Sequence, residues 1–129
     1  MAVTHSTAAR NAATDAVTAL IGASGKLAFR TAGTVAAPGT VVATLSLSAT
    51  AFGASASGTA TANAITSDTN ATGNATAVST ATLQTSGGTV VIHCAVAASA
   101  SDINMSNGLT VNAGDTVSCS SLTYTALSA

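Results

Sequence analysis

The chain has 129 residues and a net charge of −1, and charged residues make up only 5% of it. Ala, Thr and Ser account for 70 of the 129 residues, and aromatic residues for only 2%. A chain of this length forms one domain, and its three cationic side chains are too few to bind a nucleic acid or an anionic membrane.

The first segment with a regular period is residues 4–22, THSTAARNAATDAVTALIG, which predicts an amphipathic helix of about four turns. Either Thr4 or Ser6 can serve as its N-cap, and Gly22 is placed to stop it. Arg10 and Asp15 lie off the apolar stripe. The stripe itself consists of Ala13, Ala16, Val17, Leu20 and Ile21. We therefore expect residues 1–25 to form an arm and a helix that packs on a sheet or on a neighbouring subunit.

From residue 26 the hydrophobic period changes to two, which indicates β-strands. Leu45 and Leu47 are the expected core residues of the clearest strand, and glycines 87 and 88 predict a hairpin turn. In the last strand, Val117 and Cys119 alternate on one face and Leu122 and Tyr124 on the other. A bulge near Ser120 and Ser121 would bring all four side chains onto one face. The expected strands are residues 26–31, 41–52, 59–66, 75–85, 89–97, 109–112 and 116–126. Residues 26–129 are thus predicted to form an antiparallel β-sandwich or jelly-roll-like domain, mainly β, with one N-terminal α-helix.

The acid–base groups are few. His93 with Asp102 and one of many serines could form a Ser/His/Asp group, but no nucleophile motif is present. The segment from Asp68 to Gly73 is similar to a calcium loop, yet its twelfth position is Ser79 where a glutamate is needed. A turn stabilised by Asp and Asn side chains is therefore predicted there instead. We therefore expect no catalytic residues, no metal and no cofactor, and the chain is not predicted to be an enzyme.

Two further residue patterns have structural interpretations. Cys94 and Cys119 have no metal-ligand spacing and share strand parity with apolar residues, which predicts two buried thiols. A disulfide between them remains open, because it depends on which strands pair. Three Thr-x-Thr pairs lack the regular repeat of an ice-binding face, so we interpret them as solvent-side threonines of a sheet: Thr59/Thr61, Thr80/Thr82 and Thr123/Thr125.

No run of ~20 apolar residues is present, so no membrane-spanning helix is predicted. The first residues lack the basic and apolar regions of a secretory signal. This start fits a protein that is made and used inside a cell or is released by lysis.

The order of elements resembles small virion structural proteins of tailed bacteriophages, of the head decoration or cement type. The resemblance lies in the patterning of residues 5–22, 25–33, 42–63 and 111–126 and covers nearly the whole chain. It implies a β-sandwich or jelly-roll core and an oligomer, with trimers favoured and dimers second. It also implies binding to the major capsid protein on the capsid exterior, after synthesis in the bacterial host cytoplasm.

These observations favour a non-enzymatic capsid decoration protein that stabilises the phage head, with Val17, Leu20 and Ile21 as the expected interface residues. The alternative within the virion is a collar, tail or fibre component that binds a host surface. A small hydrolase or carbohydrate-binding domain is the alternative of a different class. The scarcity of aromatic residues and the missing nucleophile motif argue against it.

Overall fold

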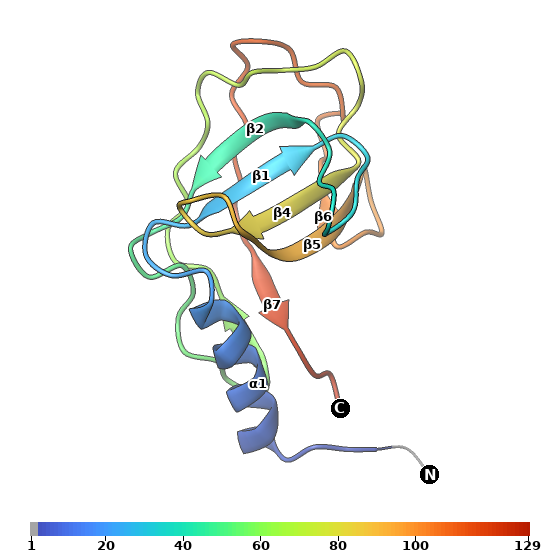
Figure 1. Ribbon diagram of the computed structural model, residues 1–129. Helices are drawn as coiled ribbons and strands as arrows, with labels where there is room; N and C mark the ends of the chain where they lie inside the picture. The colour runs from blue at the N-terminus through green and yellow to red at the C-terminus, as the bar shows by residue number, and fades with distance from the viewer. Residues whose placement is uncertain (1–2) are drawn as a thin grey trace.

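A five-stranded sheet forms the centre of the computed structural model, which describes residues 3–129 (Figure 1). Its strands lie in the order β2-β1-β4-β5-β6 and have the bounds β1 Lys26–Arg30, β2 Val41–Ser46, β4 Thr80–Gln84, β5 Val90–Ala97 and β6 Ile103–Asn104. The prediction of a mainly β domain with one N-terminal helix is confirmed. The sheet is mixed, because the short β6 runs parallel to β5 whereas the other neighbours are antiparallel.

A second, smaller sheet pairs β3 (Thr59–Thr61) with β7 (Thr123–Thr125), and helix α1 (Thr7–Ala19) packs against both strands. We call α1, β3, β7 and the turn at residues 55–58 the helix unit. Figure 1 shows this unit below the main sheet, with the C-terminus beyond it. The chain thus separates into a sheet with an apolar core and a helix unit attached to one end of it.

The inner face of the main sheet carries the core in two rows of cross-strand neighbours. Leu27 faces Leu45 on one side and Leu83 on the other, and Phe29 lies between Ala43 and Ala81. The two residues predicted as core, Leu45 and Leu47, are 0% and 6% exposed, so that prediction is confirmed. Residues from the irregular segments close the core from the other side: Ala71, Val78, Val111, Val117 and Leu122.

The outer face of the sheet is covered by one arginine. Arg30 folds back over Ala28 and donates hydrogen bonds to Thr82 Oγ1 (3.0 Å), Gln84 Oε1 (3.0 Å) and Gly39 O (2.9 Å). Thr82 in turn donates to Gln84 Oε1 at 2.9 Å. The guanidinium and the loop that contains Gly39 therefore shield this face. The prediction that Thr80 and Thr82 face solvent was wrong, since both are buried.

Several predicted strands are shorter than their sequence patterns. The expected strand at 59–66 is regular only over β3, and the expected strand at 116–126 only over β7. Residues 109–112 form no strand, whereas the unpredicted β6 lies just before them. The irregular segments are held by isolated backbone pairs, such as the bridge between Asp68 and Val117. The hairpin predicted between residues 75–85 and 89–97 is confirmed as β4–β5.

Candidate functional site

Helix α1 docks through polar side chains. Ser6 is its N-cap and accepts a hydrogen bond from the Ala9 N–H, and Gly22, with φ of 70°, follows the end of the helix as predicted. The buried helix residues are Thr14 and Thr18. The helix packs on a sheet, as one of the two predicted arrangements has it, and it does so through these polar residues and not through the apolar stripe.

The surface that receives the helix is a tight turn. Ser57 and Gly58 have φ of 51° and 82°, and Ala56 and Thr59 exchange two backbone hydrogen bonds around them. Two consecutive positive φ values are typical of a two-residue hairpin of type I′, which Gly58 allows without a steric penalty. This hairpin brings the peptide groups of residues 55–58 against α1.

Four hydrogen bonds between residues 10–15 of the helix and residues 55–58 fix the helix to this hairpin. Asn11 Oδ1 accepts from the Gly58 N–H at 2.8 Å, and Asp15 Oδ1 accepts from the Ser55 N–H at 2.9 Å. Ser55 Oγ donates to the Asn11 carbonyl, and Arg10 Nη1 donates to Ser57 O. Because these contacts involve only polar groups, the hydrophobic period of the helix gave no indication of them.

Thr14 is the central contact of the helix unit. Its Oγ1 donates to Gly58 O at 2.6 Å and accepts from the Ala126 N–H at 3.1 Å. In the register of β3 and β7, Gly58 and Ala126 would be the next pair after Thr59 and Thr125. The Thr14 hydroxyl thus takes the place of a direct hydrogen bond between the two strands as they separate.

The structure separates the three predicted interface residues. Ile21 is 1% exposed and belongs to the core, Val17 is half-buried, and Leu20 is 66% exposed. The rest of the exposed helix surface is small and uncharged: Thr7, Ala8, Ala9, Ala12, Ala16 and Ala19. Of the predicted set, Leu20 is the side chain available to a partner.

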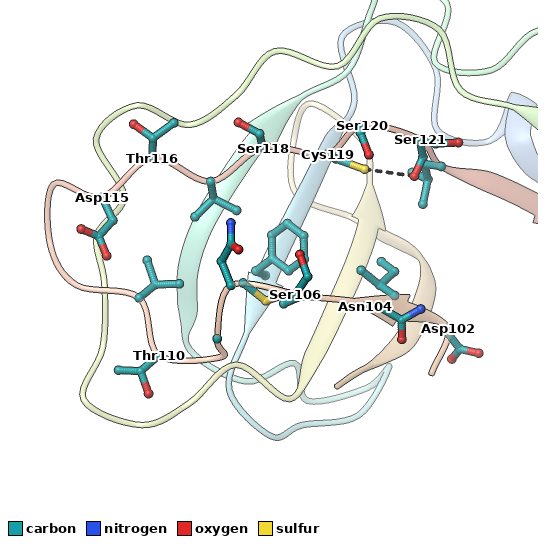
Figure 2. Close-up of a pocket in the computed structure, with 18 of the residues that line it drawn as sticks. Asp102, Asn104, Ser106, Thr110, Asp115, Thr116, Ser118, Cys119, Ser120 and Ser121 are labelled. Carbon is teal, nitrogen blue, oxygen red and sulfur yellow. Dashed lines mark hydrogen bonds between the residues drawn. The ribbon is translucent and has the colours of Figure 1, made fainter. Parts of the chain in front are cut away.

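A cavity of about 610 Å³ lies between Phe29 on the sheet and the irregular segment 102–123. Figure 2 shows polar side chains from both arms of this segment around it, with Asp102 and Asp115 at opposite ends. The deeper part of the lining is apolar and comes from core or core-contacting residues: Phe29, Ile103, Met105, Val111, Val117 and Leu122. The cavity exists because this segment covers the sheet without forming a second regular layer.

The two carboxylates at the cavity are engaged by backbone N–H groups. The Asp102 carboxylate accepts from the Ala95 N–H and that of Asp115 from the Asn112 N–H, both at 2.9 Å. Cys119 Sγ contacts Ser121 O at 3.4 Å (Figure 2), and burial raises the pKa of its thiol, partly opposed by a backbone hydrogen bond with Ser121. A protonated thiol is a poor nucleophile. The lining therefore offers polar recognition without an activated nucleophile.

The other candidate groups from the sequence are not assembled into a site. His93 Nε2 is buried without a hydrogen-bond partner among residues 3–129, and the Asp102 carboxylate accepts from the Ala95 N–H. Asp68 caps a turn by accepting from the Asn70 N–H, and its second oxygen accepts from the Thr44 N–H. The turn predicted in place of a calcium loop is confirmed.

Cys94 and Cys119 are both free thiols, so the open question of a disulfide is answered in favour of two thiols, but both are half-buried and not buried as predicted. Within residues 3–129 no three His, Cys, Asp or Glu side chains cluster closely enough to hold a metal ion. In the same part of the chain, no helix is long and apolar enough to span a membrane. No family model, curated protein or solved structure matches the chain.

Proposed function

We propose that this chain is a non-enzymatic structural protein of a bacteriophage virion that decorates the outer capsid lattice and stabilises the head. The observation that supports this most is the exposed face of α1. The helix turns its polar residues inward and leaves Leu20 and a row of alanines in solvent. A helix on a protein surface normally places its charged and polar residues outward.

This face is suited to a tightly packed contact. Alanine side chains allow close approach of a partner backbone, and a surface without charge has little solvation to lose when it is covered. Leu20 would contribute apolar burial of about 1.5–3 kcal/mol if a partner covered it completely. The partner we propose is the major capsid protein, with the helix placed across a boundary between capsomers and opposing their separation.

A pair of matched variants tests the contact. Leu20→Asp should abolish binding to particles that lack this chain, because it places a charge in the proposed interface. Val35 is also an exposed apolar residue, at 60%, but lies in the loop between β1 and β2, so Val35→Asp should bind normally. Both variants should melt like the wild type. Equal binding by Leu20→Asp would refute the helix contact.

Copy number distinguishes the positions on the virion. Quantitative mass spectrometry of purified particles should give a ratio to the major capsid protein close to that of a lattice component. A ratio of only a few copies per particle would place the chain in the collar, tail or fibres. Absence from particles would refute the virion proposal altogether.

A further inference from the structure

The outer edge of β7 is unpaired. The Ala62 N–H donates to Leu122 O, so the alternation of an antiparallel pair directs the peptide groups of Tyr124 toward β3 and those of Thr123 and Thr125 away from it. Neither residue has a backbone hydrogen bond on that side within residues 3–129. In Figure 1 α1 and β3 lie to the left of β7, and no segment is drawn along its right side.

Both edges of the main sheet, by contrast, are protected. Residues 66–73 cover β2, with backbone bonds at Ser46 and Val42 and the Asp68 carboxylate on the Thr44 N–H. On the other edge, the register of β5 is irregular near its start. The Asp102 carboxylate accepts from the Ala95 N–H, and β6 pairs with the end of the strand. Bulges, charges and short covering strands are the usual means by which proteins block edge pairing. The Thr123–Thr125 edge has none of them.

We propose that β7 pairs with β7 of a second copy of this chain, in an antiparallel, two-fold register centred on Tyr124. In this register Thr123 lies opposite Thr125 of the partner subunit, and the two peptide groups exchange both hydrogen bonds. The symmetry repeats the exchange at the other end, so four backbone hydrogen bonds form. The two small sheets then become one continuous sheet across the dimer.

The side chains are complementary to themselves in this register. Tyr124 faces Tyr124 of the partner subunit at a position without backbone bonds, where side chains approach most closely. On the opposite face, Thr123 meets Thr125 of the partner subunit and extends the existing cross-strand pair of Thr59 and Thr125, whose hydroxyls lie 2.7 Å apart. Aromatic pairs and threonine pairs are both favourable between strands. A second copy therefore fits this edge through both its backbone and its side chains.

The three-residue length of β7 makes the contact small. Interfaces of this size give weak association, with dissociation constants of roughly 1 µM to 1 mM. This inference goes beyond the proposed function, and it favours a dimer over the trimer expected from the sequence. It is independent of particle binding through Leu20, which lies on the helix.

A charge-exchange series measured by sedimentation equilibrium tests the register. The wild type should show a concentration-dependent dimer. Thr123→Lys with Thr125→Lys places like charges opposite each other twice and should raise the dissociation constant about tenfold or more. Thr123→Lys with Thr125→Glu places opposite charges at the same positions and should restore the dimer. Thr61→Lys, on the same exposed face but on β3, should leave dimerisation unchanged.

Circular dichroism and thermal melting of each variant establish that it is folded. A wild type that stays monomeric at all concentrations would overturn the inference, as would a Lys/Glu variant that stays monomeric while folded. Equal disruption by Thr61→Lys would also overturn it, because that residue is not on the edge. A monomeric wild type that still binds particles would refute the β7 pairing and leave the proposed function standing.

Discussion

The main sheet and the helix unit are stabilised by different interactions. The sheet packs Leu, Val and Phe side chains in two rows on its inner face, and apolar burial supplies its stability. The helix unit is fixed by directional hydrogen bonds with a tight turn, in which Asn11 and Asp15 accept from backbone N–H groups and Thr14 donates to a carbonyl. Apolar packing tolerates small shifts of a side chain, whereas each of these hydrogen bonds requires one donor and one acceptor at a fixed place.

The largest loss of stability is expected when a side chain of the apolar core is shortened. Leu45 is completely buried between β1 and the irregular segments, so Leu45→Ala should lower the free energy of unfolding by about 2–5 kcal/mol. Leu20→Ala removes the same atoms from an exposed site, so it should change the free energy of unfolding by less than ~0.5 kcal/mol. Urea denaturation measures both. Similar losses for the two variants would show that Leu20 is not exposed as described.

The helix unit should be most sensitive at Thr14. Thr14→Val keeps the shape of the side chain but leaves Gly58 O and the Ala126 N–H without a partner, which should cost about 1–3 kcal/mol. Thr7→Val makes the same change at an exposed position of the helix and serves as the control. Amide hydrogen exchange should accelerate at Ala126 and Gly58 in Thr14→Val, and stay slow in the main sheet.

Unchanged exchange at Ala126 in Thr14→Val would contradict the bridging role of the Thr14 hydroxyl. Global acceleration, in the main sheet as well, would show instead that the helix unit and the sheet unfold together. Either result changes how independent the two regions are.

The difference between the regions also explains what the sequence could predict. Strand alternation located Leu45, Leu47 and the β4–β5 hairpin, because period-two burial leaves a direct trace in the hydrophobic pattern. The helix itself was predicted from its caps and spacing. Its docking face was not, because Thr14 and Thr18 are buried by hydrogen bonding and not by hydrophobicity. The Ser57–Gly58 pair was the available signal, as a two-residue hairpin turn.

The candidate surfaces were predicted in part. Leu20 was identified from the helical stripe, but the same stripe included Ile21, which the turn after the helix carries into the core. The free edge of β7 could not be predicted, because strand order depends on long-range pairing that the local pattern does not record. The cavity beside residues 102–123 results from strands that the pattern predicted and the fold does not form.

The outer face of the main sheet provides an intermediate case. Arg30→Met should cost about 1 kcal/mol, because it removes three donated hydrogen bonds, while Thr82 and Gln84 keep the bond between themselves. Lys26 points to the same face and donates one bond, to Ser46 Oγ, so Lys26→Met should change stability by less than ~0.5 kcal/mol. Equal effects in thermal melts would show that the Arg30 network adds nothing specific.

The smallest effect concerns the thiol on the inner face of the sheet. Burial raises the pKa of Cys94 from 9.0 to about 11, and the Asp102 carboxylate adds to the shift. The folded state then holds this proton more tightly than the unfolded state. Its contribution to stability is fully present below pH 9 and is lost as pH rises from 9 toward 11. Denaturation at pH 8, 9 and 10 should show stability falling over this interval.

The stability of the Cys94→Ala variant should fall less steeply over the same pH range, because this variant lacks the Cys94 thiol. The Cys119→Ala variant tests the second thiol in the same way. Burial also raises the pKa of Cys119, but a hydrogen bond with the Ser121 backbone opposes that shift. Iodoacetamide at pH 8 should therefore alkylate Cys94 more slowly than Cys119, because the thiolate is the reactive form. Faster alkylation of Cys94 would mean that the interior of the sheet opens more readily than the cavity wall, the reverse of the stability expected from their packing.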